Sequence, residues 1–507
     1  MWNRRQSLLI LLAILAVGLV VRTHNLTDLG LWQDERLPVL AARGLLYEIP
    51  ESTTEPTFTA DLYLQHDNYS RLREAALWGE GSNTMFYLIV LRSWTQIFGF
   101  SDLSLRLMQV LLGLATIALL YAFMSRLTGS RRWGLLAAAL AAAHPTMVQY
   151  SMELRSYDLG AFMTLLGTYL FLLLYVRPDE SAGPRRHFLL LGFYFVVAFA
   201  SLMTHYFTVF VYGGHFIYML VFHRPWKVLL PYLGVVVAVF GGLYIWLVPL
   251  GGSEGFKMIE HRNKKWAEMM ESLKDDADNA VIRPATPLYL MGGLSQSLTS
   301  LGGVGFQGRG WRIREFFPLL LIPVILLLTG LLSRANPLRW RVLLGGLCLL
   351  LPFMYVVMAI RAGHTMSFNP TYNMLNVAFV VGLMVLAARA AMHTPRTAVR
   401  IALVVLLLAQ TGIMYFSAHP RNAHFMSSPN QYVAAAEAVK ASYQPGEVVV
   451  WADWYTAQLA NLYLRDRTDI LQSVATPPTQ KVFIRNISGD DRIVATIQDE
   501  WHKLPQE

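Results

Sequence analysis

The chain has 507 residues, of which 54% are hydrophobic and 15% are charged, and its mean hydropathy is +0.39. This composition is too apolar for a soluble protein, and the chain carries many apolar runs near bilayer-spanning length. The formal net charge of +9 does not indicate a nucleic-acid partner, since the basic residues stand in short groups between apolar runs. The one cysteine, Cys348, lies in an apolar run and excludes a disulfide framework.

The first apolar run stands in "MWNRRQSLLILLAILAVGLVVR", which has the charged and apolar parts of a signal peptide. No A-x-A-like cleavage site follows and further spans do, so we expect a retained helix. A spanning helix needs about 20 mostly apolar residues. Eleven runs approach this length: 7–22, 104–126, 133–150, 159–176, 187–204, 206–223, 227–249, 316–333, 340–360, 371–391 and 398–416. The segment 83–100 is a doubtful twelfth, because Arg92 interrupts it, and an ordinary tilted span there stays an alternative.

The distribution of Lys and Arg orients these spans. If 83–100 does not cross, five basic loops share the side of Arg4 and Arg5: "SRLTGSRRW", "VRPDESAGPRRH", "HRPWK", "SRANPLRWR" and "RAAMHTPRTAVR". Short cytoplasmic loops are rich in Lys and Arg, so we predict a cytoplasmic amino terminus and an external carboxyl terminus. The outer side then carries the first loop 23–103, the turn 149–158, the loop 251–315 and the tail 417–507, and 83–100 lies along the interface.

The first outer loop contains "LWQDERLPVLAARGLL" at 31–46. Apolar residues recur at helical spacing from Leu37, and Pro38 suits a first helical turn. We therefore expect Asp34 and Glu35 just before an amphipathic helix. Acids near a helix start also favour the helix dipole, which explains one such acid without any function.

The second outer turn lies in "QYSMELRSYDLGAF" and places four polar residues at the end of a helical hairpin: Glu153, Arg155, Tyr157 and Asp158. Ionisable residues close to the membrane are costly and mark a site by default. Other polar residues are expected on the same side: Arg106, His205, Tyr206, and Arg361 and His364 in "IRAGHTMSFNPTYN". Arg suits phosphate, although a single Arg at a helix end commonly snorkels. Together these groups predict a pocket for a ligand that bears a phosphate and hydroxyls.

Four motifs follow one another in the first half of the chain. "WQDE" follows the first span, "FGFSDLSLR" ends an aromatic helix at 98–106, and "RLTGSRRWGLLAAALAAAHP" precedes "QYSMELRSYDLGAF". In this order they resemble the GT-C superfamily of polyprenyl-phosphate-sugar glycosyltransferases, with protein O-mannosyltransferases and lipid A aminoarabinose transferases as the nearest branches. The resemblance covers residues 1–220, and 340–390 more loosely. Where many relatives have His-x-Pro or Lys-Pro-Pro, the chain has "GEGSNTMFY", which leaves the contribution of Glu80, Asn83 and Thr84 open.

The resemblance implies a polytopic all-α membrane protein with the GT-C fold. It implies an inverting hexosyl- or pentosyltransferase that moves a sugar from an undecaprenyl-phosphate-type carrier to a hydroxyl of a lipid, glycan or protein acceptor. It makes Asp34 the catalytic base or a metal-site acid, with Glu35 beside it. It also carries over Arg106, Arg155, Tyr157 and Asp158 as site residues, and Arg361 with His364 as a clamp for the carrier phosphate.

From their positions, Glu35, Glu153 and Asp158 are expected to hold sugar hydroxyls or a cation, and His205 and Tyr206 to complete the binding site. A divalent metal ion stays an open question, because these acids and His205 could bind one but no ligand spacing demands it.

The loop 251–315 starts with a polar helical stretch at 260–281 and becomes glycine-rich at 292–310. It is either a mobile lid or a solvated helix with a linker. From residue 427 the pattern changes to helix, strand, helix and strand, in "NQYVAAAEAVKASY", "GEVVVWAD", "WYTAQLANLYL" and "KVFIRNI". We therefore expect a catalytic membrane domain at 1–426 and a small periplasmic α/β domain at 427–507.

Two other functions stay open. The chain could be a transporter or flippase of a phosphate-bearing lipid or solute, or a structural subunit of an envelope-synthesis complex. Transporters bind near the membrane midplane, whereas the acids and arginines here stand at the outer ends of spans, which favours the enzyme. The scarcity of cysteine and the basic inner loops fit a bacterial inner membrane. The sugar, the acceptor and the oligomeric state are not specified by the sequence.

Overall fold

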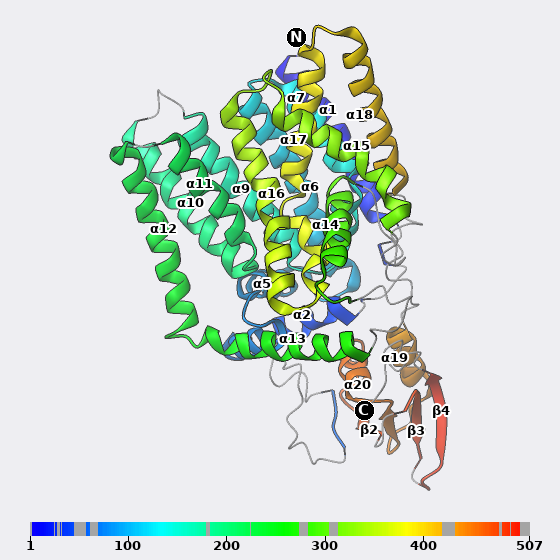
Figure 1. The fold of residues 1–507 in the computed structure, drawn as a ribbon. Coiled ribbons are helices and arrows are strands. Elements are labelled where there is room, and N and C mark those ends of the chain that lie inside the picture. The colour runs from blue at the N-terminus through cyan, green and yellow to red at the C-terminus, as the bar shows by residue number, and fades with distance from the viewer. Residues whose placement is uncertain are drawn as a thin grey trace. The chain divides into compact units, whose positions relative to one another are not determined.

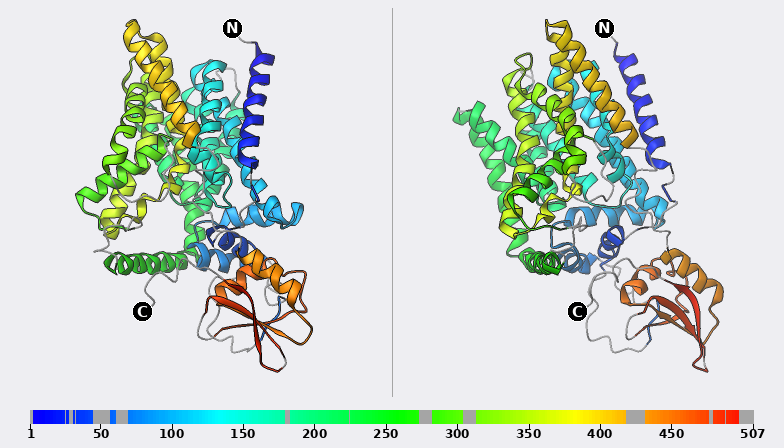
Figure 2. Two further views of the ribbon diagram at one scale, coloured as in Figure 1. Left: turned by 90° about the vertical axis from the view of Figure 1, so that its right-hand side faces the viewer. Right: turned by 45° about the vertical axis from the view of Figure 1, so that its right-hand side comes forward.

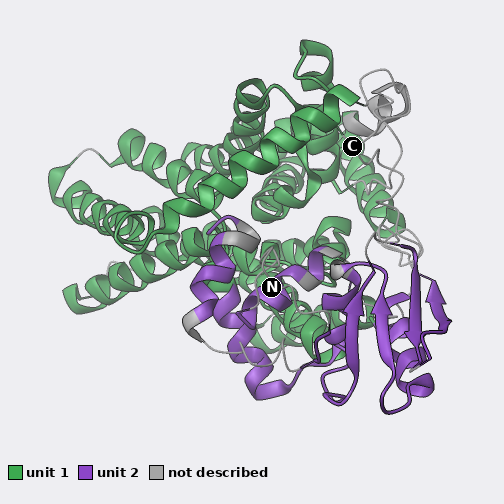
Figure 3. Cartoon of the chain, turned by 90° about the horizontal axis from the view of Figure 1, so that it is seen from below, with its two compact units in different colours: residues 1–26, 83–87, 103–425 green, residues 27–82, 88–102, 426–507 purple. Residues whose placement is uncertain are grey.

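A computed structural model describes residues 3–24, 26–27, 31, 33–44, 57–60, 69–178, 183–223, 225–272, 282–303, 313–417, 431–475, 479–486 and 488–496. The chain divides into two compact units (Figure 3). Unit 1 consists of residues 1–26, 83–87 and 103–425, and unit 2 consists of residues 27–82, 88–102 and 426–507.

Unit 1 is a bundle of long apolar helices (Figure 1). In the described part of the chain, seven helices are long and apolar enough to cross a membrane: α1 (Arg4–Thr23), α6 (Asp102–Thr128), α9 (Tyr157–Phe171) with the π-helical turn η1 (Leu172–Val176), α10 (Pro184–Thr204), α12 (Trp226–Leu247), α16 (Leu338–Ala362) and α18 (Thr397–Ser417). α1, α12 and α18 stand at the edges of the bundle (Figures 1 and 2) and bury the smallest share of their residues. The predicted polytopic helical fold is confirmed.

The other predicted spans also contain helices: α7 (Arg131–Ala143), α8 (Pro145–Tyr150), α11 (Thr208–Phe222), α15 (Ile313–Leu332) and α17 (Val377–His393). The single span predicted at 133–150 is wrong, because the helix breaks between α7 and α8. His144, with ψ of 120°, leaves the helical region just before Pro145, and a residue before proline disfavours the helical conformation for steric reasons. α17 is buried on every side from Val377 to Leu386 and forms the centre of the bundle.

Short elements close the end of unit 1 that lies away from the amino terminus. α13 (Gly255–Ser272) follows the 3-10 turn η2 (Gly252–Glu254) and crosses below the spans in Figure 1. α14 (Pro287–Leu301), η3 (Thr365–Phe368) and η4 (Pro370–Leu375) complete this end. The glycine-rich stretch expected as a loop is helical up to Leu301. A Cβ on Gly293 would come within 2.6 Å of the Phe368 ring, so glycine lets α14 pack against η3. Residues 304–312 lie outside the described part.

Unit 2 combines helices of the first outer loop with a small sheet. The helices are α2 (Gln33–Ala42), α4 (Tyr69–Glu80), α19 (Gln431–Ser442) and α20 (Trp454–Asn461), and α5 (Met85–Phe98) is shared between the units. The strands are β1 (Val448–Trp451), β2 (Leu471–Val474), β3 (Lys481–Arg485) and β4 (Asp491–Thr496), in the order β2-β1-β3-β4. β1 runs parallel to β2 and antiparallel to β3. The sequence predicted β1 and β3 and missed β2 and β4, which are partly exposed.

The sheet and the first outer loop are connected by hydrogen bonds. Phe58 and Gln472 exchange two backbone hydrogen bonds of 2.7 Å, and Arg465 donates to the Phe100 carbonyl over 2.8 Å. The predicted domain start at residue 427 falls beside the boundary of unit 2 at residue 426, but unit 2 also includes most of the first outer loop.

The doubtful span at 83–100 contains α5, which has 14 residues. This is about 21 Å of helix, which is shorter than a membrane span.

Candidate functional site

Asp34 and Glu35 stand in the first turn of α2, in unit 2. The helix starts at Gln33, so the expectation that both acids precede it is wrong, and Pro38 lies inside the helix. All residues from Pro38 to Ala42 are buried. Glu35 is buried and Asp34 is half-buried, which makes Asp34 the more accessible carboxylate.

The turn between α8 and α9 lies in unit 1 and buries its acids. Glu153 is 7% exposed and accepts a 3.1 Å hydrogen bond from the Gln149 amide, and Asp158, in the first turn of α9, is 1% exposed. Within the described residues, neither carboxylate oxygen of Asp158 has a hydrogen-bond partner.

Gln109 on α6 also contacts this turn, although the sequence reasoning missed it. Its amide donates to the Arg155 carbonyl (3.1 Å) and to the Tyr87 hydroxyl (2.8 Å). The sequence could have indicated Gln109, because it is a polar residue inside an apolar run.

Arg22 is a second residue that sequence reasoning missed. It stands in the last turn of α1, yet it is fully buried. Its Nη1 donates to the carbonyls of Gly18 (3.2 Å) and Ala142 (3.1 Å). An arginine in the last turn of a first span normally snorkels to the interface, so only the packing reveals that this one faces inward.

Aromatic rings extend from the turn to the start of α11. The Arg155 guanidinium lies 5.6 Å from the centre of the Tyr157 ring, and that ring lies 5.6 Å from His205 and 6.0 Å from Tyr372. The Phe207 N–H donates to His205 Nδ1 over 3.2 Å. Burial, and then the charge of Arg155, lower the pKa of His205 to about 3. His205 is therefore a neutral imidazole at neutral pH.

Glu153, Arg155, Tyr157, Asp158 and His205 are thus brought together in unit 1. Tyr206 points elsewhere: its hydroxyl accepts a 3.3 Å hydrogen bond from the Trp246 indole and its ring packs 5.9 Å from Phe256.

Arg106 is buried on α6, and its Nη1 donates to the Leu26 carbonyl over 2.6 Å. This bond fixes the chain as it leaves α1.

Arg361 and His364 differ in their exposure. Arg361 is exposed in the last turn of α16, whereas His364 follows Gly363 and is buried. The backbone of buried Arg283 and Pro284 pairs with this segment: the Thr365 N–H donates to the Arg283 carbonyl over 3.0 Å, and Pro284 and His364 form a β-bridge. The Arg283 guanidinium lies 5.5 Å from the centre of the Tyr289 ring. Burial lowers the pKa of His364.

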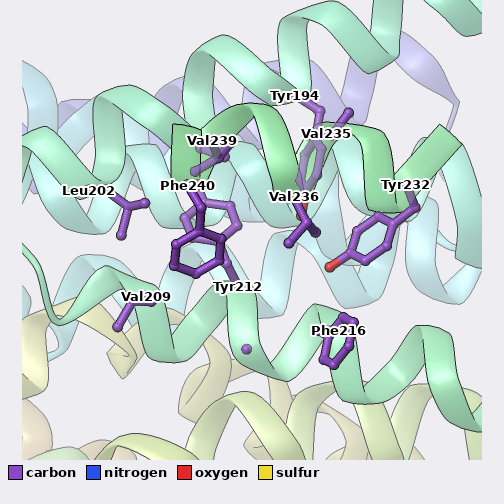
Figure 4. Close-up of a pocket in the computed structure, with 12 residues that line it drawn as sticks. Tyr194, Leu202, Val209, Tyr212, Phe216, Tyr232, Val235, Val236, Val239 and Phe240 are labelled. Atoms are coloured by element: carbon purple, nitrogen blue, oxygen red, sulfur yellow. The ribbon is translucent and has the colours of Figure 1, made fainter. Parts of the chain in front are cut away.

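α10, α11 and α12 enclose a separate apolar groove of about 350 Å³ in unit 1 (Figure 4). The groove is almost free of polar surface because the tyrosine hydroxyls on its wall bond inward. Tyr194 bonds to His215 Nδ1 over 2.9 Å and Tyr212 bonds to Ser201 over 2.8 Å.

In the described residues, no group of three or more His, Cys, Asp and Glu side chains is arranged to hold a metal ion. Asp34 and Glu35 belong to unit 2 and the other candidates to unit 1, so their convergence on one site stays a prediction.

The chain is similar to known proteins in part of its sequence and in its fold. Residues 82–246 match the family model of dolichyl-phosphate-mannose-protein mannosyltransferase. No curated protein matches the chain at the sequence level. Among solved structures, ArnT from Cupriavidus metallidurans bound to undecaprenyl phosphate is 14% identical with a TM-score of 0.52, over 91% of this chain and 85% of that one. The same protein in the apo state is 15% identical with a TM-score of 0.54, over 90% and 84% of the chains.

The oligosaccharyltransferase AglB from Archaeoglobus fulgidus, in complex with an inhibitory peptide and a dolichol-phosphate, is 12% identical with a TM-score of 0.51. The alignment covers 87% of this chain but only 59% of AglB, so the chain spans about three fifths of that protein's length. The chain therefore has the fold of the GT-C glycosyltransferases, and over residues 82–246 it resembles the dolichyl-phosphate-mannose-protein mannosyltransferases.

Proposed function

We propose that the chain is a membrane glycosyltransferase that moves a sugar from a polyprenyl-phosphate carrier to a hydroxyl of a lipid, glycan or protein acceptor on the outer face of a bacterial inner membrane. The observation that carries this proposal is the cluster of Glu153, Arg155, Tyr157 and Asp158 at the end of a GT-C bundle. One ArnT structure contains undecaprenyl phosphate, and one AglB structure contains a dolichol-phosphate.

In the proposed reaction the acceptor oxygen bonds to the anomeric carbon while the bond from that carbon to the carrier phosphate breaks. Attack from the face opposite the phosphate inverts the anomeric centre. Asp34, half-buried and at the start of α2, takes the proton of the acceptor hydroxyl, a role that contributes a factor of about 10² to 10⁴. The electron pair of the broken bond leaves with the carrier phosphate.

Negative charge that grows on the departing phosphate requires cations fixed in advance. Arg106 and Arg361 are our candidate cations, and His364, whose pKa is lowered by burial, is a candidate hydrogen-bond donor. Buried Arg283, whose carbonyl accepts from the N–H of Thr365, adds a further cation. Glu35, Glu153 and Asp158 are assigned to sugar hydroxyls or to a divalent ion, and His205 and Tyr206 complete the binding site.

The carrier also has a long hydrocarbon tail, for which the groove between α10, α11 and α12 offers about 350 Å³ of apolar space. Ligand pockets of this kind bind mainly through apolar contact. We assign part of the tail to this groove.

The deciding experiment incubates the purified protein with a polyprenyl-phosphate sugar labelled in the sugar, in vesicles of bacterial lipids. An enzyme leaves the label on a new molecule. A flippase moves the labelled carrier across the membrane unchanged, and a structural subunit does neither. Absence of any new labelled product would refute the proposed function.

The variant Asp34→Asn tests the assignment of the base. We expect transfer to fall at least about 100-fold while carrier binding stays, because the amide cannot accept the proton. Asp469→Asn is the matched control in the same unit, since Asp469 is an exposed acid paired with Arg467 at 2.9 Å. Full activity of Asp34→Asn would remove Asp34 from the mechanism.

A further inference from the structure

Two arginines lie beside one indole ring at the end of unit 1 where α16 starts and α17 ends (Figure 1). The ring belongs to Trp340, in the first turn of α16, which is 8% exposed. The guanidinium carbon of Arg177 lies 5.7 Å from the centre of this ring, and that of Arg389 lies 5.4 Å from it. Arg177 follows η1 and Arg389 stands near the end of α17, so the fold brings together two positive charges from distant parts of the chain.

Hydrogen bonds fix both guanidinium groups. Nη1 of Arg177 donates to the carbonyls of Arg126 (2.9 Å) and Leu127 (3.1 Å), and Nη2 of Arg126 donates back to the Arg177 carbonyl over 2.8 Å. Nη1 of Arg389 donates to the side-chain oxygen of Asn336 over 2.9 Å. The two arginines are therefore held in place before any ligand binds.

These bonds leave other donors of the two arginines unused. Arginines at helix ends commonly do no more than reach toward the interface. Within the described residues, however, only Nη1 of Arg177 and Nη1 of Arg389 donate to protein atoms. Both side chains are half-buried, so their Nε and Nη2 groups are accessible to a ligand.

The charge of the pair is not compensated within the described part of the chain. No acidic side chain there pairs with Arg177 or Arg389, and Asp179 and Glu180, the acids of the basic loops, lie outside it. Two like charges beside one ring repel each other, and a bound anion would remove this repulsion. The planar fork of arginine suits a phosphate, to which it donates two parallel hydrogen bonds.

Exposed apolar side chains adjoin the two arginines. Leu332 at the end of α15, Leu338 at the start of α16 and Met392 in the last turn of α17 are 65%, 56% and 61% exposed. A tryptophan at the end of a span favours the depth of the lipid head groups. A free anion has no use for apolar surface, whereas a phospholipid carries its phosphate next to acyl chains. Basic pockets between membrane helices are known to bind the head groups of anionic lipids.

We propose that Arg177, Arg389 and Trp340 form a binding site for the phosphodiester head group of an anionic phospholipid, whose acyl chains lie along the three apolar residues. The site is separate from the groups assigned to sugar transfer. Asp158 stands in the first turn of α9, and Arg177 follows η1, which continues that helix. The 20 residues of Tyr157–Val176 span about 30 Å between them. Binding of this lipid therefore does not depend on the proposed function.

Thermal unfolding of the purified full chain in detergent tests the proposal. A ligand that binds only the folded chain raises the melting temperature. Dioleoylphosphatidylglycerol should raise it to a saturating value. Dioleoylphosphatidylcholine, whose choline balances the phosphate charge, and inorganic phosphate should raise it little. A shift as large from either of these two as from the phosphatidylglycerol would overturn the proposal.

Arg177→Gln and Arg389→Gln test the two side chains. Each should raise the phosphatidylglycerol concentration at half of the maximal shift at least about tenfold, because charge-assisted hydrogen bonds to the phosphate are lost. Arg400→Gln is the matched control, since Arg400 is exposed on α18 and its replacement removes the same charge. It should leave that concentration unchanged. Equal losses in all three variants would show a general attraction of charges and overturn the site.

Lysine variants keep the test decisive if a glutamine variant does not fold. Arg177→Lys and Arg389→Lys retain the charge but not the fork, because an ammonium group cannot offer two parallel donors. The concentration at half of the maximal shift should still rise in both. The natural value in both lysine variants would contradict the proposed binding of the head group by the two arginines.

Discussion

His205 and Asp158 are polar side chains that are buried in the fold. The burial of His205 should make the stability of the protein depend on pH. A histidine in the unfolded chain has a pKa of about 6.5, whereas burial lowers that of His205 to about 3. Between these values the unfolded state binds a proton that the folded state does not. The contribution of His205 to stability is therefore fully present above pH 6.5 and decreases as the pH falls toward 3, by up to about 1.4 kcal/mol per pH unit.

His205→Asn should make the melting temperature less sensitive to pH between 6.5 and 4. Asparagine can still accept from the Phe207 N–H, so the backbone bond at 3.2 Å is retained. His261→Asn on α13 is the control, because His261 is exposed and its replacement should leave the pH dependence unchanged. The measurement is thermal unfolding in detergent over this pH range, and identical pH profiles for His205→Asn and the natural chain would contradict the expectation.

A close contact of α6 fixes the position of the turn between α8 and α9. α6 approaches the turn at Gly113, where an added Cβ would lie 2.6 Å from the Cβ of Ser151. Gly113→Ala should therefore displace the turn and cost about 1–3 kcal/mol of stability, together with transfer activity. Gly192→Ala on α10 is the matched control, because a Cβ there has no atom within 4 Å. Both are measured by melting temperature and by sugar transfer, and equal behaviour of the two variants would show that Gly113 is not a tight contact.

The groove of α10, α11 and α12 gives a prediction for the carrier tail. Val236 lines the groove, whereas its neighbour Val237 is 71% exposed on another face of α12. Val236→Trp should raise KM for a long-chain carrier by about fivefold, about 1 kcal/mol of lost apolar contact, and leave KM for a short-chain analogue unchanged. Val237→Trp should change neither value. A KM that does not respond to Val236→Trp at any chain length would exclude the groove as the site of the tail.

At the scale of the whole molecule, the position of the two ends relative to the membrane is testable because Cys348 is buried and is the chain's one cysteine. A cysteine introduced at Glu437, which is exposed on α19, should react with a membrane-impermeant maleimide in intact spheroplasts. A cysteine at Arg5 should react only after the membrane is opened. Labelling of both in intact cells would contradict the predicted orientation.

The sequence predicted helices better than it predicted contacts. Each predicted span contains a helix, because apolar runs of this length have few other stable states in a bilayer. The break at Pro145 was readable from the proline itself. The start of α2 was not, since Pro38 suggested a first turn and tertiary packing instead buries it inside the helix. β2 and β4 were missed because their partly exposed residues lack a clear apolar alternation.

The sequence by itself determined that this protein is a multi-span helical membrane protein with a small α/β region, because composition and the length of apolar runs are local properties. It also pointed to the turn at 149–158, since charges beside a span are conspicuous. Only the tertiary structure decided that Arg22 is buried, that Gln109 bonds to that turn, that the backbone of Pro284 pairs with that of His364, and that the first outer loop shares a compact unit with the carboxyl-terminal sheet. These contacts join residues far apart in the chain, and their energies depend on packing that no local pattern contains.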